Sequence, residues 1–315
     1  SRYLDAGIAI FLVPASWFLP PAQAELAAMV LWPAFLSCLM ALVLVHANGR
    51  LFGAAGAVGA LAVFLGWSRL GAEFVSTRVD HHSPQILGAT AVFYLSLLPG
   101  RPRLYGALAG LATALTLAIG LEMLPLLALI WGMMLIRHAF REPGAGDWLL
   151  GFCAALALAM PLLMAGQTPL SDWTTPRCDF LATPLLALAG VGIVTSLASV
   201  LSAGMVQRPA SRILIMLAVA SLALWLASPL LAPCAAGPYS QAATEVRRVI
   251  ETMVPEGKSV LLLWQAARAW LALILLPPLV IGLFALLTFP LTRGRLSPLQ
   301  SKAVLQTLIA AAVGL

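Results

Sequence analysis

The sequence predicts an all-α fold, a polytopic transmembrane helical bundle. Of its 315 residues, 61% are hydrophobic and 10% are charged, and the mean hydropathy is +0.97, so the chain cannot present a polar surface on every side. Its long apolar segments lack the two-residue alternation of a membrane β-barrel. Because a backbone in lipid must satisfy its own hydrogen bonds, these segments are expected to be helices.

Ten apolar segments are long enough, or nearly so, to cross a hydrocarbon layer about 30 Å thick, which gives about 9–11 spans. A shorter segment, 6–20, is stopped by Pro20-Pro21 and is expected to be an interfacial or re-entrant helix. We expect one transmembrane domain over 1–315, with short outer loops and a longer one at 233–259. The expected spans are 26–46, 51–67, 84–99, 104–119, 121–136, 148–165, 180–206, 213–232, 260–289 and 303–315.

We expect the two ends of the sequence to be those of a fragment. Ser1 stands where a methionine would begin a chain, and Leu315 lies inside an apolar run. We therefore expect a longer protein, from which an N-terminal span and the first outer loop are missing.

The net charge of +6 comes from basic residues spread singly between spans, which indicates membrane topology and not nucleic-acid binding. Tracing the chain through its spans places one group on a single side, cytoplasmic by the positive-inside rule. Its members are Arg50, Arg101, Arg103, Arg137, Arg141, Arg208, Arg212, Arg293, Arg295 and Lys302.

Ten of the twelve acidic residues fall on the opposite, outer side, and only Glu142 and Asp147 lie inside. This grouping indicates chemistry on the outer face, although the longer outer loops would also hold more polar residues. The ten are Asp5, Glu25, Glu73, Asp80, Glu122, Asp172, Asp179, Glu245, Glu251 and Glu256.

The segment Arg78-Val79-Asp80-His81-His82 lies between two apolar runs and is the principal candidate site. Ionisable groups at a membrane are costly and usually have a use, but a solvated loop between spans is the plain alternative. If the segment is extended, Arg78, Asp80 and His82 share one face and His81 points away. A metal site on Asp80 and His82 would need a further carboxylate from elsewhere.

Ser83 and Pro84 resemble an N-cap and first-turn proline, so the next helix would aim its positive end at the outer face. Phosphate binds readily at such a helix end, and Arg78 adds a bidentate donor. Glu122 stands between two apolar runs with almost no polar neighbours. It is therefore either neutral with a raised pKa or facing a cavity.

Other outer residues supply further candidates. Arg2 and Asp5 are spaced as a helical surface pair. The loop 167–179, with Asp172, Trp173, Arg177, Cys178 and Asp179, and the last outer loop could both touch a polar substrate. In the last loop, Arg247, Arg248 and the later Arg268 suit a lipid phosphate, although 242–253 would equally form a solvated amphipathic helix.

The four cysteines divide into two kinds. Cys38 and Cys153 lie within expected spans, where we expect them to pack as small apolar side chains. Cys178 and Cys234 lie in outer loops, where an oxidising compartment allows a disulfide, but a sequence cannot show that they are close.

Taken in order, four short motifs resemble a bacterial family of multispan proteins that looks like a branch of the GT-C glycosyltransferases. This class includes oligosaccharyltransferases, protein mannosyltransferases and aminoarabinose transferases. The motifs are Ser1-Arg2-Tyr3-Leu4-Asp5, Arg78-Val79-Asp80-His81-His82 with Gln85, Gly120-Leu121-Glu122, and Cys234-Ala235-Ala236-Gly237-Pro238-Tyr239.

The resemblance implies inverting transfer of a sugar from a polyprenyl-phosphate or diphosphate carrier to a lipid, glycan or protein acceptor, in the bacterial inner membrane with the site facing the periplasm. Asp80 matches a catalytic acidic position, in some relatives a ligand of a divalent metal, here Mg²⁺ or Mn²⁺. His82 and Glu122 are the other expected catalytic residues. The expected substrate-binding residues are Arg78, His81, Gln85, Arg2, Asp5, Tyr239, Arg247, Arg248 and Arg268.

Two other classes of function stay open. A proton-coupled transporter or lipid flippase would use Asp80, the histidines and Glu122 for coupling, but it predicts charges near mid-bilayer on broken helices. A noncatalytic subunit of a membrane complex is the third interpretation. Because most charges gather at one surface, we favour transfer.

Overall fold

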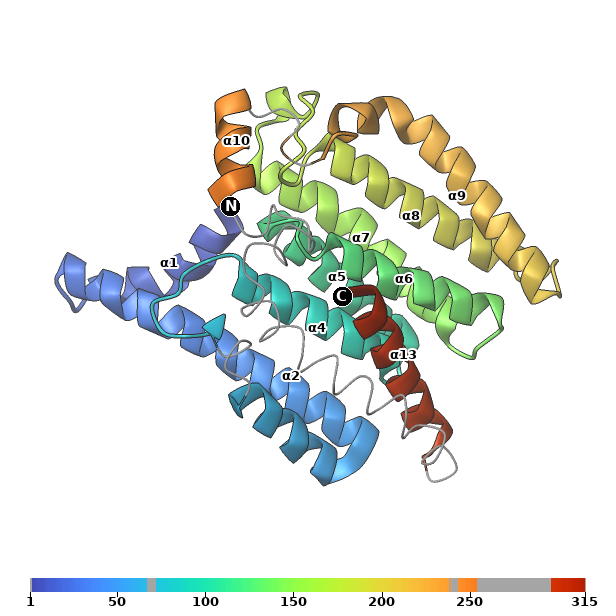
Figure 1. The fold of residues 1–315 in the computed structure, drawn as a ribbon, viewed down its shortest axis with the longest axis horizontal. Helices are drawn as coiled ribbons and strands as arrows, with labels where there is room; N and C mark the ends of the chain where they lie inside the picture. Colours follow the sequence, from blue (N-terminus) through green and yellow to red (C-terminus); the bar gives the residue numbers. More distant parts are fainter. Residues whose placement is uncertain (1, 67–71, 238, 240–242, 254–295, 315) are drawn as a thin grey trace. The chain divides into compact units, whose positions relative to one another are not determined.

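The computed structural model describes residues 2–66, 72–237, 239, 243–253 and 296–314. It divides into two compact units, residues 1–235 and 236–315, and each is described by itself. Every regular element in the described part of the chain is a helix, which confirms the all-α prediction (Figure 1).

The first unit contains eight of the described α-helices and two short 3-10 helices, while the second contains α10 (Thr244–Met253) and α13 (Pro298–Gly314). In the first unit these are α1 (Arg2–Ser16), α2 (Pro21–Gly66), α4 (His82–Leu97), α5 (Pro102–Ile119), α6 (Leu124–Ala139), α7 (Ala145–Gln167), η1 (Leu170–Asp172), α8 (Thr183–Ser202), α9 (Pro209–Leu231) and η2 (Ala232–Cys234).

Five of the described helices are long and apolar enough to cross a membrane: α2, α5, α7, α8 and the combined segment Pro209–Cys234. The chain therefore has the helices of a membrane protein. Helices α4 and α6 coincide with expected spans but have 16 residues each, about 24 Å at 1.5 Å per residue. The expected span 260–289 lies outside the described residues, so the count of 9–11 spans stays a prediction.

The first two helices differ from the expected boundaries. The short helix covers Arg2–Ser16 and not 6–20, and α2 starts at Pro21 after the Pro20-Pro21 pair. The two expected spans 26–46 and 51–67 are arms of α2, which turns back on itself at Gly53 (φ 74°), as Figure 1 shows. A positive φ suits glycine because it has no Cβ.

Close helix packing in the first unit depends on small residues. A Cβ on Gly106 of α5 would lie 2.0 Å from the backbone oxygen of Trp148 in α7, and one on Gly110 would lie 2.4 Å from that of Phe152. Gly151 of α7 meets the Arg103 carbonyl in the same way. The spacing Gly106 to Gly110 is the Gly-x-x-x-Gly pattern that lets membrane helices approach closely.

Successive helices run in opposite directions, so their loops collect at two ends of the first unit. At one end the loop before α4 meets the loop between α5 and α6 through His81 and Glu122. At the other, Arg212 of α9 donates to the carbonyl of His138 in α6. We call the first the acidic end, with Glu73, Asp80 and Glu122. The second is the basic end, with Arg137, Arg141, Arg208 and Arg212.

Candidate functional site

The loop between α2 and α4 is fixed to α2 before it reaches the site. Thr77 adopts a positive φ of 74°, and its N–H donates to the Met29 carbonyl at 3.0 Å. Arg78, the next residue, donates through Nε to Asp80 Oδ2 at 2.7 Å and binds Glu73 Oε2 at 2.8 Å. The guanidinium therefore bridges two carboxylates, of which Glu73 is 8% exposed.

Glu73 was not singled out from the sequence as a site residue. The available signal was its position five residues before Arg78 in the same outer loop. That spacing alone does not show whether the loop folds back on itself, whereas in the structure it does.

Asp80 starts helix α4. Its Oδ1 accepts the N–H of His82 at 3.0 Å, and α4 begins at His82 with His81 as the N-cap residue. The prediction of Ser83 as the N-cap is therefore wrong. Asp80 satisfies a free N–H of the first turn in its place. Ser83 is buried, and its hydroxyl donates to the Glu73 carbonyl.

The environment of Asp80 favours its ionised form. Burial alone raises the pKa of this carboxyl, but hydrogen bonds from Arg78 and the His82 N–H, with the positive charge of Arg78, outweigh burial and leave the pKa below its ordinary value. Asp80 is therefore an anion at neutral pH. Each oxygen has accepted one hydrogen bond and retains capacity for another.

Glu122 joins the same cluster from the loop between α5 and α6. Its Oε1 lies 3.1 Å from Nε2 of His81, and the rings of His81 and His82 are 4.3 Å apart. Asp80 and Glu122 are thus linked through the histidine pair, at one end of the bundle. Side chains of His81 and Glu122 are 39% and 37% exposed, so both reach solvent.

Glu122 is an anion and not the neutral acid that an apolar setting would produce. Burial raises the pKa of its carboxyl. Three effects lower this pKa by more: a hydrogen bond from its own backbone N–H, the nearby Gln85 amide, and His81. The pKa therefore lies below its ordinary value. The expected alternative of a neutral Glu122 with a raised pKa is therefore wrong, whereas its facing a cavity stays a prediction.

Gln85 lies beneath this pair. It is 0% exposed, and a Cβ on Gly120 would fall 2.1 Å from its Nε2 and 2.5 Å from Glu122 Oε2. The amide is close enough to lower the pKa of Glu122 but is not aligned for a hydrogen bond. Neither of its polar atoms has a partner in the described part of the chain. Gly120 therefore leaves space for the amide and the carboxylate to approach each other.

The described residues do not assemble a metal centre. Outside the masked stretches, no group of three or more His, Cys, Asp or Glu side chains is arranged to hold an ion. Asp80 accepts one hydrogen bond on each oxygen, from Arg78 and from the His82 N–H. Mg²⁺ or Mn²⁺ stays a prediction, and we derive no step through a metal.

The structure joins only some of the predicted site residues into this cluster within its described part. Arg2 and Asp5 are exposed on the first turn of α1, and within the described chain they form neither the expected surface pair nor a bond to the cluster. Tyr239 and Arg248 belong to the second unit, as does Arg247 on α10. Arg268 lies outside the described residues. Their roles stay predictions.

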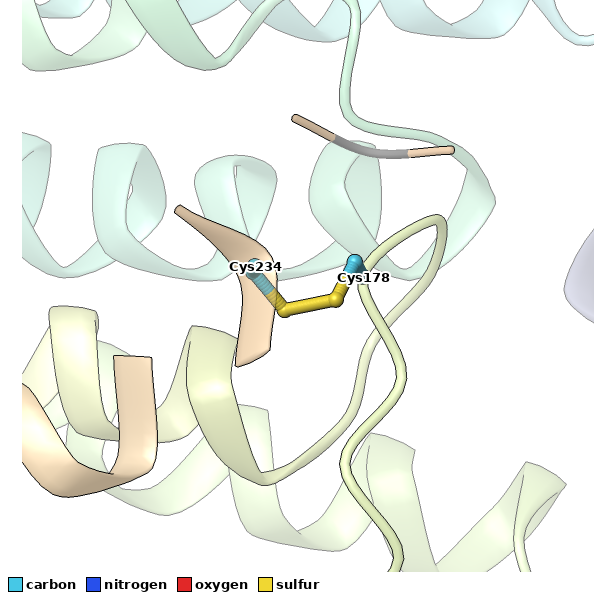
Figure 2. The surroundings of a disulfide bond; sticks show 2 residues. All are labelled: Cys178 and Cys234. Atoms are coloured by element: carbon cyan, nitrogen blue, oxygen red, sulfur yellow. A yellow bond between two sulfur atoms is a disulfide. The ribbon is translucent and has the colours of Figure 1, made fainter. Parts of the chain in front are cut away.

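A disulfide and a pocket lie in the same unit, and Leu121 links the pocket to the loop of Glu122. Cys178, in the loop before α8, is bonded to Cys234 in η2, so the pairing that the sequence left open is formed (Figure 2). Both cysteines line a pocket of about 520 Å³ whose wall also includes Leu121, the neighbour of Glu122. Cys38 and Cys153 are free thiols, of which Cys38 is exposed.

No protein-family model, curated protein or solved structure matches the chain. The likeness to GT-C glycosyltransferases therefore depends on the four motifs, and two of these, around Asp80 and Glu122, meet in the structure.

Proposed function

We propose that this protein is a membrane glycosyltransferase that moves a sugar from a polyprenyl-phosphate or diphosphate carrier to an acceptor at the acidic end. One observation carries the proposal: Asp80 and Glu122, from loops on either side of two helices, meet through His81 in a partly exposed cluster. Two ionised carboxylates beside histidines are suited to proton abstraction and charge stabilisation.

The disulfide supports an outer location for this cluster. Disulfides persist in oxidising compartments, and this one lines a pocket that Leu121, the neighbour of Glu122, also lines. Basic residues occupy the opposite end, as the positive-inside rule expects of a cytoplasmic face. Both signals support the proposed placement of the cluster on the outer, periplasmic side of a bacterial inner membrane.

In the proposed reaction, Asp80 accepts the proton of an acceptor hydroxyl or amine. The acceptor atom bonds to the anomeric carbon while the bond from that carbon to the carrier phosphate oxygen breaks, and the electron pair leaves on the phosphate. The displacement inverts the anomeric centre. His81, oriented by Glu122, hydrogen-bonds the sugar or the acceptor, and Arg78 keeps Asp80 ionised and in place.

The test is transfer of labelled sugar from a polyprenyl-phosphate donor in membranes that contain the full chain. Asp80→Asn should lower the rate by about 100-fold or more, the range for loss of a general base. Asp147→Asn is the matched control, because Asp147 is exposed at the basic end. Both variants are compared at equal amounts of folded protein, measured by melting temperature and gel filtration.

Three results would remove the proposal. One is no transfer by the native chain with any lipid-linked donor. Another is native turnover in Asp80→Asn, which would take Asp80 out of the reaction. The third is proton-coupled uptake of a solute by the native chain without sugar transfer, which would favour the transporter.

A further inference from the structure

The pocket that Leu121 lines has a mostly apolar wall among its described residues. Leucines from α6, α8 and α9 form much of its wall, including Leu124, Leu188 and Leu224. Among the described residues that line it, Arg177 is charged and Ser228 carries a hydroxyl. A size of about 520 Å³ falls within the range of ligand pockets, about 300–1,000 Å³. An apolar wall with a cation is complementary to an amphiphile with an anionic head.

Arg177 is available to such a head group. Its side chain is exposed, and within the described chain no carboxylate is paired with it. The guanidinium carbon lies 5.7 Å from the centre of the Phe180 ring, another residue of the pocket wall. A contact with an aromatic face orients the planar guanidinium and leaves N–H groups at its edge for a phosphate.

The disulfide holds the two sides of the pocket together. Cys178 follows Arg177 directly, and Cys234 follows the end of α9, so the bond ties the arginine's loop to the helix that forms the opposite wall (Figure 2). A covalent tie fixes the opening before a ligand arrives, which lowers the ordering cost of binding. The disulfide therefore keeps these two lining segments next to each other.

Among the described residues of the cluster at Asp80, carboxylates outnumber arginines. Its described members include three carboxylates, Glu73, Asp80 and Glu122, whereas Arg78 is engaged by the first two. Arg177 borders a pocket that Leu121 also lines, next to Glu122 in the chain. Arg177 therefore gives the pocket a cation that can bind a phosphate.

We infer that this pocket binds a single-chain lipid phosphate, with the hydrocarbon nearest the head among the leucines and the phosphate on Arg177. The inference rests on the proposed function and deepens it, because it assigns the binding site of the lipid carrier. Its position would hold the phosphate beside the loop that carries Glu122.

The test measures equilibrium binding of a long-chain polyprenyl monophosphate to the full chain in detergent micelles. Arg177→Gln should raise the Kd by about tenfold or more, since a charge-assisted hydrogen bond is lost. The uncharged polyprenol of equal length should bind the native chain as weakly as the phosphate binds the variant. Arg208→Gln, at the other end of α9, is the matched control and should change nothing.

A second variant tests the apolar wall. Leu224→Trp places a larger side chain in the pocket at a position that is already 47% exposed, so it should fold. It should weaken the phosphate and the polyprenol alike by about tenfold. An unchanged Kd in either Arg177→Gln or Leu224→Trp overturns the inference.

Two competition experiments fix the ligand class. Millimolar inorganic phosphate should fail to displace the lipid, and displacement would show a site for the head group alone. Two-chain phosphatidylglycerol should compete more weakly than the single-chain lipid, and equal competition would overturn the assignment to a carrier.

Asp80→Asn separates this inference from the proposed function. It should bind the lipid phosphate with native affinity while losing transfer. Loss of binding in Arg177→Gln together with an inactive native chain would leave the pocket standing without the transferase. Active transfer by the native chain, with no effect of Arg177→Gln on binding, would support the transferase and overturn the assignment of the pocket.

Discussion

The two ends of the first unit satisfy their charges in different ways. At the acidic end, Arg78, Asp80, His81 and Glu122 interact mainly with each other, and their side chains are 27% to 39% exposed. At the basic end, Arg212 is 5% exposed and donates to backbone carbonyls of His138, Ala203 and Val206. Arg212 is thus held by backbone carbonyls, while Arg137 and Arg141 bind the side chains of Glu142 and Gln207. The acidic end keeps partly exposed polar groups that a ligand can reach.

This difference follows from where helices end. Carbonyls are left without partners at the last turn of a helix, and a cation there satisfies them. Arg212 does so for the ends of α6 and α8. The carboxylates at the other end lie near helix N-termini. Among their hydrogen bonds in the described chain, the one from the His82 N–H to Asp80 caps a helix, whereas the bonds with Arg78 and His81 join side chains.

The largest expected effect is at the basic end. Arg212→Met should destabilise the protein by about 3 kcal/mol, because it removes three hydrogen bonds from a buried cation to the carbonyls of His138, Ala203 and Val206, at about 1 kcal/mol or more each. The measurement is unfolding in detergent, followed by melting temperature. Arg208→Gln is the exposed counterpart on the same helix and should stay close to native.

Transfer by the folded fraction of Arg212→Met should be native. A variant that melts normally but transfers poorly would move a functional role to the basic end and cancel the contrast between the ends.

Much of this contrast was predictable from the sequence, and the reasons are local. Apolar length and the alternation of spans fixed which loops share an end, so Asp80 and Glu122 were correctly placed together. The Gly106 to Gly110 spacing also carried a packing signal, which the structure realises between α5 and α7.

Contacts between side chains were not predictable, because they depend on how closely helices approach. The His81 to Glu122 contact joins residues 41 apart. It requires α4 to lie against α5, where a Cβ on Gly88 would fall 2.0 Å from Thr116 Oγ1. The Arg2 and Asp5 pair failed for a different reason: an exposed ion pair is worth about 1 kcal/mol or less, too little to fix two long side chains.

A smaller effect is expected from one methyl group at the acidic end. Gly120→Ala places a Cβ against Gln85 Nε2 and Glu122 Oε2, so it should push Glu122 from His81 and lower transfer by about tenfold. The backbone itself permits alanine, since φ is −176°. Gly132→Ala is the control, because its Cβ would meet nothing within 4 Å.

The activity of Gly120→Ala is compared with its melting temperature. Equal transfer in the two glycine variants would mean that the position of Glu122 is unimportant. A large loss of stability in Gly120→Ala without a loss of activity would give Gln85 and Gly120 a purely structural role.

The smallest effect concerns acid. The pKa of Glu122 lies below its ordinary value of 4.5, so its carboxylate stabilises the folded state above that value, and this contribution is lost as the pH falls through the lowered pKa. The contribution should be about 1 kcal/mol or less, because the pair with His81 is more than one-third exposed.

Glu122→Gln should therefore show a flatter fall of melting temperature below pH 4.5 than the native chain. About 1 M salt, which screens exposed pairs to within about 3 Å, should bring the native curve toward that of the variant. Parallel curves at low salt would mean that Glu122 does not interact with His81 in solution, and the link between the two carboxylates would be lost.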